Sequence, residues 1–439
     1  MRRRLLLVAG VFVAVSSQAA LQTSTIVLEG AWLFAADGRA PIEDSAILVE
    51  DGRISAVGRR GTVRAPASAA RVDLTGTFVI PALIDAHSHP GYIDVRRMST
   101  SAAHYTRDTI TDHLRRYAYY GVASTLSLGL DRGELPFQLR GQSIAGAALF
   151  HTAGRGIAWP NAGPLAGHWR DAAYGVTTAS EGRAAVGELA SLGVRLVKIW
   201  VDDRGGTVPK LPASLYRPII QDAHARGLRV VAHVYYLADG KELLRAGVDG
   251  FAHGIRDVEV DDEFVALFTA RPQVFLLPNL PDGPPSDTEL TWLSETLPAA
   301  HIDRLRQLPR TRSENAERLF DIQRRSLRRL AAAGVRIGLG TDAGAVSDGV
   351  SFGWSAHMEL ADMVAGGMTP ADALVAATRT SAAILELAQS GTIAAGRSAD
   401  FIVLEANPLE DIRNTRRISR VYLRGTPVDR AVLAAGWRR

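Results

Sequence analysis

Eight short apolar segments, many rich in β-branched residues, alternate with amphipathic stretches through the middle of the chain. Strands are predicted at 80–89, 123–129, 144–154, 196–202, 230–234, 250–254, 274–279 and 336–341. Helices between and after them are predicted at 216–226, 239–246, 261–270, 316–333 and 371–377. Strands that alternate with helices form parallel βα units, and eight units close a barrel. We therefore predict an α/β fold, a (β/α)8 TIM barrel over residues 80–388.

Both ends of the chain have a different pattern, in which short apolar stretches are separated by turn residues. Residues 21–79 contain such a stretch at 46–49, and residues 389–439 repeat the pattern with a stretch at 400–404. Apolar stretches between turn signals are typical of β-hairpins. We predict that the two ends together build one small β-sandwich domain.

The chain of 439 residues contains no cysteine. Disulfide scaffolds, iron–sulfur clusters and cysteine nucleophiles are therefore excluded, and any metal must be held by nitrogen and oxygen. The formal net charge is +4, of which Arg2, Arg3 and Arg4 supply three charges. The remaining balance gives little support to nucleic-acid binding, so we expect no nucleic-acid partner.

Residues 1–20 have the pattern of a secretory signal peptide. Three arginines precede an apolar run at 5–15, and the small residues Ala19 and Ala20 follow it. An N-terminal membrane anchor is the alternative, but the run is too short to span ~30 Å of hydrocarbon as a helix. We expect cleavage near residue 20, no stable membrane span afterwards, and a periplasmic or secreted protein.

Four histidines and one aspartate stand at the carboxyl ends of predicted strands. His87 and His89 point to the same side of the first strand, because side chains alternate along a strand. His233 and His253 end the fifth and sixth strands, and Asp342 follows the eighth. Each alone has an ordinary explanation, either a hydrogen-bonded core histidine or a helix-capping aspartate. Since the strand ends of a barrel meet on one face, we expect all five to form a metal site.

Lys198 stands within the apolar fourth strand. The chain has only three lysines against 47 arginines, which suggests that this position needs a primary amine. Burial lowers the pKa of an amine and keeps it neutral. A neutral amine can take up carbon dioxide and become a carbamate that bridges two cations. A Schiff-base lysine and a structural lysine are the alternatives.

The combined set resembles the binuclear metal centre of the amidohydrolase superfamily, in the subtype with a carboxylated lysine. In chain order the residues are His87, His89, Lys198, His233, His253 and Asp342. Residues 76–85 are similar to that superfamily's approach to the first barrel strand, and residues 391–403 to its return into the sheet domain. The resemblance covers nearly all of the chain after the signal segment. It is to the branch of imidazolonepropionase-like proteins and of Xaa-Pro and Xaa-Arg dipeptidases.

The resemblance implies two divalent metal ions, expected to be Zn²⁺, and carbon dioxide bound as carboxylated Lys198. The first-strand histidines, the lysine and Asp342 would hold the more buried ion, and the lysine with the other two histidines the more exposed one. A bridging hydroxide would attack the substrate, and Asp342 would pass its proton to the leaving group. The implied activity is hydrolysis of a C–N bond in a small substrate such as a dipeptide or N-acyl amino acid.

Two tyrosines follow His233. Mononuclear deaminases of the superfamily carry a glutamate where this chain has Tyr236, which disfavours deamination. Some dipeptide-cleaving relatives carry a tyrosine where this chain has Tyr235, and its phenol could act in catalysis by donating a hydrogen bond to the developing oxyanion. A packed aromatic side chain is the alternative for Tyr235.

The loops after strands three, four and six contain candidates for binding a substrate carboxylate. They are Arg155, His168, Arg204 and Arg256. A lactonase, esterase or phosphotriesterase is the alternative activity, because the same hydroxide attacks any polarised ester. A metal-bearing binding protein without catalysis is a further alternative, against which the intact Asp342 argues. A homo-oligomer is compatible with the sequence.

Overall fold

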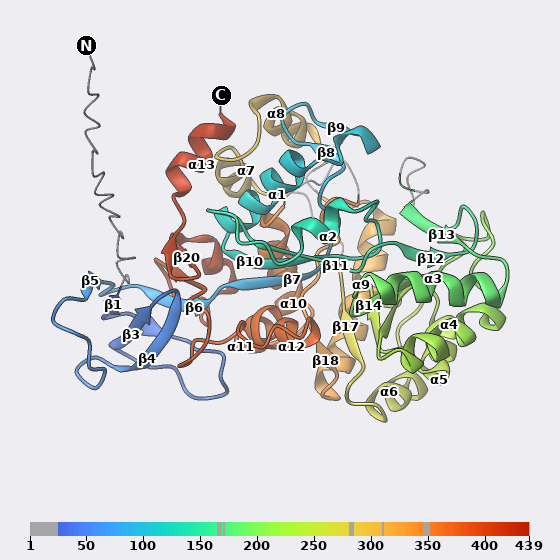
Figure 1. Cartoon of the computed structure of the whole chain (residues 1–439), viewed down its shortest axis with the longest axis horizontal. Coiled ribbons are helices and arrows are strands. Elements are labelled where there is room, and N and C mark those ends of the chain that lie inside the picture. Colours follow the sequence, from blue (N-terminus) through green and yellow to red (C-terminus); the bar gives the residue numbers. More distant parts are fainter. Residues whose placement is uncertain are drawn as a thin grey trace, which may run out of the picture.

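The computed structural model describes residues 25–164, 169, 172–280, 285–309, 311–345 and 352–438, shown in Figure 1. The predicted signal segment 1–20 and the candidate His168 lie outside these residues. No helix within the described ranges combines the length and the apolar character that a membrane crossing requires.

Parallel strands lie at the centre of the molecule in two sheets, ordered β11-β10-β7 and β13-β12-β14-β15-β16-β17-β18. Their bounds are β7 (Leu83–Ser88), β10 (Val122–Ser127), β11 (Leu149–Thr152), β12 (Gly156–Ala158), β13 (Ala173–Gly175), β14 (Leu196–Val201), β15 (Arg229–Val234), β16 (Gly250–Ala252), β17 (Phe275–Leu277) and β18 (Arg336–Ile337). Every predicted strand overlaps one of them, and the third, predicted over 144–154, contains β11, while β12 begins two residues after its end. The predicted α/β class is confirmed.

Backbone hydrogen bonds join the two sheets. After β18 the chain lies beside β7, where Asp342 N donates to His87 O at 2.8 Å and His89 N donates to Ala343 O at 2.8 Å. At the other junction, Gly156 N donates to Gly129 O at 2.8 Å. The last parallel strand is thus a neighbour of the first, which is the relation that a closed barrel requires.

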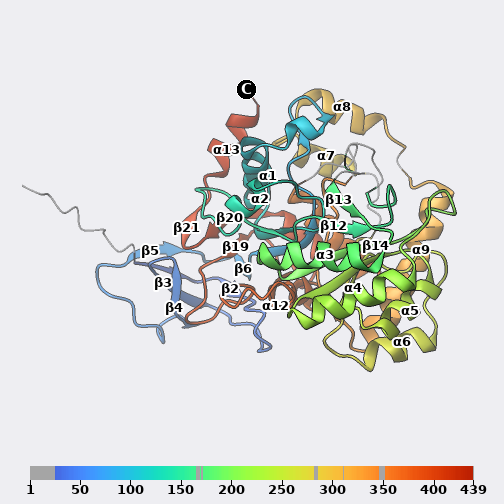
Figure 2. The same cartoon turned by 45° about the vertical axis from the view of Figure 1, so that its right-hand side comes forward.

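The helices follow the strands along the chain. They are α1 (Arg107–Tyr119), α2 (Leu135–Leu139), α3 (Ala179–Ser191), α4 (Ala213–Ala225), α5 (Leu237–Ala246), α6 (Asp262–Thr269), α7 (Asp287–Leu293), α8 (Ala299–Gln307), α9 (Glu314–Ala332), α10 (Trp354–Ala365), α11 (Pro370–Val375), α12 (Ser381–Ile384) and α13 (Arg430–Trp437). The five predicted helices correspond to α4, α5, α6, α9 and α11. Figure 2 shows α3, α4, α5 and α6 side by side along one side of the molecule. Their starts are set locally, since Thr178 and Asp261 accept hydrogen bonds from the first turns of α3 and α6.

The two chain ends form two further sheets, ordered β4-β3-β1-β5 and β2-β6-β19-β20-β21. Their bounds are β1 (Ile26–Glu29), β2 (Trp32–Leu33), β3 (Ser45–Glu50), β4 (Arg53–Arg59), β5 (Ala70–Asp73), β6 (Phe78–Pro81), β19 (Phe401–Leu404), β20 (Ile418–Leu423) and β21 (Thr426–Pro427). β6 pairs antiparallel with β19, so residues more than 300 positions apart share one sheet. A buried apolar cluster that includes Leu28, Ile47, Val79 and Phe401 joins the two sheets.

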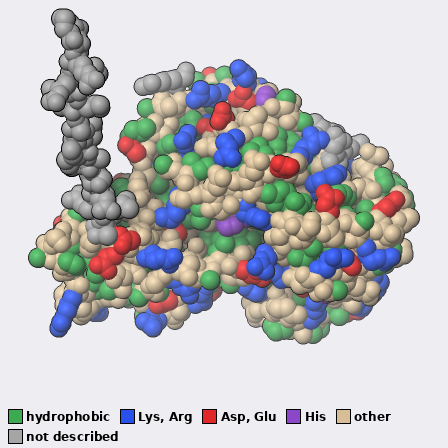
Figure 3. All heavy atoms as spheres, in the orientation of Figure 1, with side chains coloured by type: hydrophobic (Ala, Val, Ile, Leu, Met, Phe, Trp, Pro, Cys, Tyr) green, Lys and Arg blue, Asp and Glu red, His purple; other side chains and the backbone are tan. Residues whose placement is uncertain are grey.

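A two-stranded ribbon, β8 (Ile93–Asp94) with β9 (Ser99–Thr100), follows β7 in the chain. The face of the molecule in Figure 3 has acidic and basic side chains interspersed, with apolar surface between them. Charges on this face are therefore not separated by sign.

Candidate metal centre

The six predicted metal ligands line one cavity of about 460 Å³. His87 lies on β7 and His89 directly follows it, while Lys198 and His233 lie on β14 and β15. His253 is the first residue after β16, and Asp342 lies shortly after β18. The folding of parallel strands side by side brings these distant positions together, as the sequence predicts.

Asp342 contacts both histidines of the first parallel strand. Its Oδ1 atom lies 2.9 Å from His89 Nε2 and 3.2 Å from His87 Nε2. One ligand atom from each of these three residues falls within 4.8 Å of the others, close enough to hold one metal ion. Both imidazoles are buried, so solvent does not satisfy them.

Asn279, just after β17, fixes the orientation of the His87 ring. His87 Nδ1 donates to Asn279 Oδ1 at 3.0 Å, which leaves the lone pair on Nε2. That Nε2 atom is buried without a hydrogen-bond partner and faces the Asp342 carboxylate, which is also an acceptor. Two facing acceptors fit a shared cation. Sequence reasoning missed Asn279, although it is the last residue of the predicted seventh strand.

Asp202 has the corresponding role for His233. His233 Nε2 lies 3.1 Å from the Asp202 carboxylate and 3.1 Å from Arg256 Nη2, and donation from Nε2 to the carboxylate leaves the lone pair on Nδ1. The ring centroids of His233 and His253 are 4.5 Å apart, and those of His253 and His87 are 5.2 Å apart. Asp202 was also missed, and its signal was its place as the last residue of the predicted fourth strand.

Burial sets the protonation of the histidines. It lowers the pKa of His233 to about 4, and it lowers the pKa of His87 and His253 well below the usual range. Burial alone would raise the pKa of Asp342, but the nearby histidines outweigh it and hold that pKa below its usual range. Neutral imidazoles beside a carboxylate are the ligand forms that a divalent metal binds.

Lys198 is 1% exposed. Burial lowers the pKa of its amine to about 7, with Arg256 adding to the effect and Asp342 opposing it. Its ammonium makes no hydrogen bond or ion pair with any residue that the structure describes. A substantial fraction of the amine is therefore neutral near pH 7, as carboxylation requires.

Three residues that follow parallel strands near the cavity have positive φ angles, in the left-handed region that favours glycine. The φ angles are 98° at His253, 48° at Asn279 and 57° at Asp342. Such strain costs on the order of 1–3 kcal/mol per residue and is concentrated at functional sites. Here it occurs at the ends of three consecutive parallel strands, β16, β17 and β18.

Some of the predicted catalytic and substrate-binding residues line the cavity, and others do not. Tyr235, Arg204 and Arg256 line the cavity. Arg155 is absent from the described lining, because its guanidinium stacks on the Tyr174 ring at 3.9 Å and donates to Ala173 O at 3.1 Å. His168 lies outside the described residues.

Three further aromatic residues contribute to the rest of the wall. Trp169, Trp200 and Tyr236 line the cavity together with Leu130. The Tyr236 hydroxyl donates to the carboxylate of Asp203 at 2.9 Å, which holds that ring at the rim. A cavity with apolar walls and a few converging polar groups suits a small organic substrate.

Comparisons with known proteins agree with this site. The Amidohydrolase family matches residues 194–428. A Mycobacterium tuberculosis protein described as uncharacterized is 29% identical over 75% of this chain and 78% of its own length. The imidazolonepropionase of Salinispora tropica is 26% identical over 91% of this chain and 94% of its own.

A solved structure extends the likeness to the whole fold. It is a Bifidobacterium longum protein whose assignment as a prolidase is provisional, with 27% identity and a TM-score of 0.71 over 94% of this chain and 99% of that one. The family match covers more than half of the chain. The chain therefore belongs to the amidohydrolase family, in its imidazolonepropionase-like branch, and is a hydrolase that acts on carbon–nitrogen bonds.

Proposed function

We propose that this protein is an exported, zinc-dependent amidohydrolase that cleaves the C–N bond of a dipeptide or an N-acyl amino acid. The observation that carries the proposal is the convergence of four histidines, Lys198 and Asp342 on one cavity. The names of the relatives, an imidazolonepropionase and a provisional prolidase, support a small amide substrate.

The donor set fits two divalent cations. The buried, unpartnered Nε2 of His87 faces Asp342, and the lone pair on His233 Nδ1 is free because Asp202 holds Nε2. Nitrogen and oxygen donors without thiolates suit zinc. The neutral amine of Lys198 could add carbon dioxide with loss of a proton, and the resulting carbamate would supply two further oxygen donors.

Two bound cations would polarise the scissile carbonyl and acidify an attacking water. Asp342 takes the proton of that water and delivers it to the leaving nitrogen. Tyr235, whose side chain lines the same cavity, donates a hydrogen bond to the developing oxyanion. Asn279 and Asp202 keep the histidine rings in the tautomers that face the cavity.

The finer architecture belongs to the same proposal. Residues 80–388 form a closed (β/α)8 barrel, supported by the hydrogen bonds between β7 and the chain after β18. Residues 21–79 and 389–439 form a β-sandwich, supported by the pairing of β6 with β19. Residues 1–20 are a signal peptide, and the mature protein is periplasmic or secreted. It acts on a small molecule, without a nucleic-acid partner.

The test is elemental analysis of protein purified without chelators, together with its intact mass under gentle conditions. We expect two zinc ions per chain and a carbon dioxide adduct on Lys198. The loaded protein is then assayed on dipeptides, N-acyl amino acids, lactones and phosphotriesters. Cleavage of lactones or phosphotriesters in preference to amides would replace the proposed activity, and one metal per chain would contradict the bridged centre.

A further inference from the structure

We infer that Arg256 makes this site selective for substrates with a free carboxylate one carbon away from the scissile nitrogen. The inference rests on the proposed function and deepens it. Arg256 differs from the other cationic candidates in its position and its contacts, and no described carboxylate lies within ion-pair distance of its guanidinium.

Arg256 is fixed beside the metal centre by the end of β15. Its backbone N–H donates to Tyr235 O at 2.9 Å, and its Nη2 donates to Val234 O at 3.1 Å. The same Nη2 lies 3.1 Å from His233 Nε2. The guanidinium carbon lies 4.9 Å from the centroid of the Tyr235 ring. Backbone and side chain are thus both anchored, and the guanidinium directly contacts one proposed metal ligand, His233.

The charge of Arg256 has no carboxylate partner within ion-pair distance in the part of the chain that the structure describes. Asp202, which lines the same cavity, accepts from the His233 ring with Oδ2 and from the backbone N–H of Arg204 with Oδ1. The Nε atom of Arg256 is buried without a hydrogen-bond partner. A partly buried cation without a carboxylate in direct contact is costly, so an anionic ligand at this place reduces an existing penalty.

A substrate carboxylate is the anion that matches this guanidinium. Its two oxygens can accept two parallel N–H bonds from the planar fork of an arginine. Arg256 also touches His233, so a bound carboxylate leaves only a short distance to the metal ligands. In a dipeptide or N-acyl amino acid, one carbon separates the carboxylate from the scissile nitrogen, which suits this short distance.

The guanidinium groups of the other two arginine candidates have other contacts. Arg204 lines the cavity, but its guanidinium donates to Gly163 O. Arg155 stacks on Tyr174 and does not line the described cavity. Arg256 therefore carries the selectivity, and replacing the carboxylate by an uncharged amide should remove most of its benefit.

The experiment compares acid and amide forms of the same compounds on metal-loaded protein. The substrates are N-acetyl-L-amino acids and dipeptides, each paired with its C-terminal amide. We expect Arg256→Met to lower kcat/KM for the acids roughly 10- to 100-fold, the range of a charge-assisted hydrogen bond. The amides should change by less than about threefold. Arg256→Lys should recover part of the loss, because it restores the charge without the fork.

Arg140→Met is the matched control. Arg140 also stacks on an aromatic ring, Phe137, and donates to the backbone carbonyls of Leu192 and Gly193, but it does not line the described cavity. It should leave both acid and amide turnover unchanged. Metal content is measured for every variant and should match the wild type.

Calorimetric binding of free L-amino acids and their amides to loaded protein separates this inference from the proposed function. Preferential binding of the acids that Arg256→Met abolishes supports the inference even if no amide bond is cleaved. Equal binding of acid and amide by the wild type would overturn it. An equal loss for both forms in Arg256→Met, or loss of metal from that variant, would also overturn it, since either result would assign Arg256 to holding His233.

Discussion

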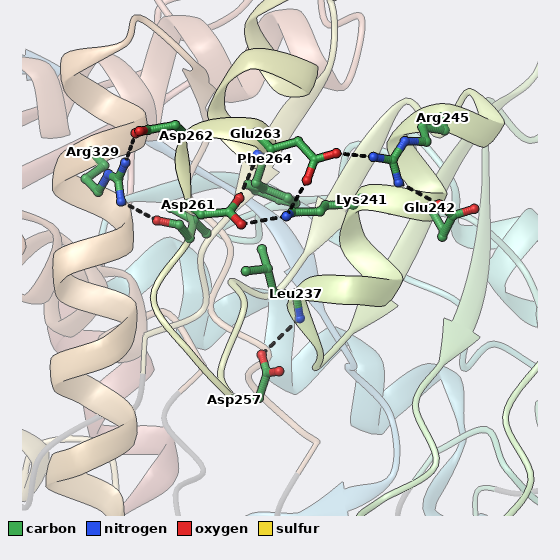
Figure 4. Close-up of polar contacts among 11 residues, drawn as sticks. Leu237, Lys241, Glu242, Arg245, Asp257, Asp261, Asp262, Glu263, Phe264 and Arg329 are labelled. Atoms are coloured by element: carbon green, nitrogen blue, oxygen red, sulfur yellow. Dashed lines mark hydrogen bonds and ion pairs between the residues drawn. The ribbon is translucent and has the colours of Figure 1, made fainter.

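Two of the three lysines in this chain have opposite surroundings. Lys198 on β14 is buried and makes no ion pair with a described residue, and burial brings its pKa to about 7. Lys241 on α5 contacts Asp261 at 2.5 Å and Glu263 at 2.6 Å (Figure 4). The hydrogen bonds to these two carboxylates raise the pKa of Lys241 above its usual value. The same side chain is thus poised to lose its charge in one place and held charged in the other.

The difference teaches what each lysine contributes. Lys241 belongs to a chain of ion pairs that continues from Glu263 to Arg245 and Glu242, and it connects α5 to the start of α6. Any cation of suitable length could serve there. Lys198 has no such partner among the described residues, and the proposed carbamate requires its amine to be neutral.

Removing the buried lysine should have the largest effect. In Lys198→Ala the carbamate cannot form, so we expect loss of the second metal and a fall in kcat/KM of roughly 10³-fold or more. Bicarbonate with a short carboxylic acid should restore part of the activity. Metal analysis and kinetics measure both effects, and Lys241→Ala should keep full metal content and activity. A fully active Lys198→Ala protein with two metals would contradict the bridging role.

Asp342→Asn tests the proton transfer, which the proposal assigns to Asp342 and not to Lys198. We expect substrate binding to persist while kcat falls roughly 10²- to 10⁴-fold, because an amide cannot accept the proton of the attacking water. Single-turnover kinetics alongside equilibrium binding of a substrate would separate the two quantities. Wild-type turnover would mean that another group transfers the proton.

Asn279→Ala removes the acceptor that orients His87. Without it, the ring can turn or change tautomer, so we expect metal affinity to fall roughly 10- to 100-fold, the usual range for a lost partner of a ligating histidine. Competition with a chelator of known affinity gives the value. Replacing Asn407, whose contacts with Glu410 and Leu409 are remote from β17, provides a matched asparagine control with no expected change. Unaltered affinity in Asn279→Ala would show that packing alone orients the ring.

The pH dependence of the metal-free protein should show the smallest effect. Lys198 titrates near pH 7 when folded and near its ordinary value of 10.5 when unfolded. Between these values the unfolded chain binds one more proton, so stability rises with pH. Thermal unfolding from pH 7 to about 10 should show a rise that is smaller in Lys198→Met. Equal slopes in both proteins would mean that the folded amine keeps its ordinary pKa.

Much of the fold, and the convergence of the candidate ligands on one cavity, could be predicted because the signals are local. An apolar run that ends in histidine marks a buried strand with a polar end, and this holds for His233 and His253 alike. The boundaries agree less closely, since the predicted strand 144–154 contains only β11, at Leu149–Thr152, and β12, at Gly156–Ala158, was not predicted. The alternation of side chains correctly placed His87 and His89 on the same cavity.

The contacts that adjust the site could not be predicted, because they join distant parts of the chain. His87 and Asn279 are 192 positions apart, and Asp202 meets His233 across 31 positions. Neither asparagine nor aspartate has a sequence pattern that identifies it as the partner of a particular imidazole. Asn279 and Asp202 therefore became visible only once the strand ends were adjacent.

The sequence by itself determined the α/β class, the nitrogen and oxygen chemistry of the ligands, and their positions at strand ends, because periodicity and residue type are properties of the local chain. The tertiary structure decided how the histidine rings are oriented and that Arg256 contacts His233 with no described carboxylate within ion-pair distance. It also decided that Lys198 is poised to lose its charge and Lys241 is not. Charge state and tautomer depend on burial and on neighbours far away in the chain, and only the folded molecule brings those together.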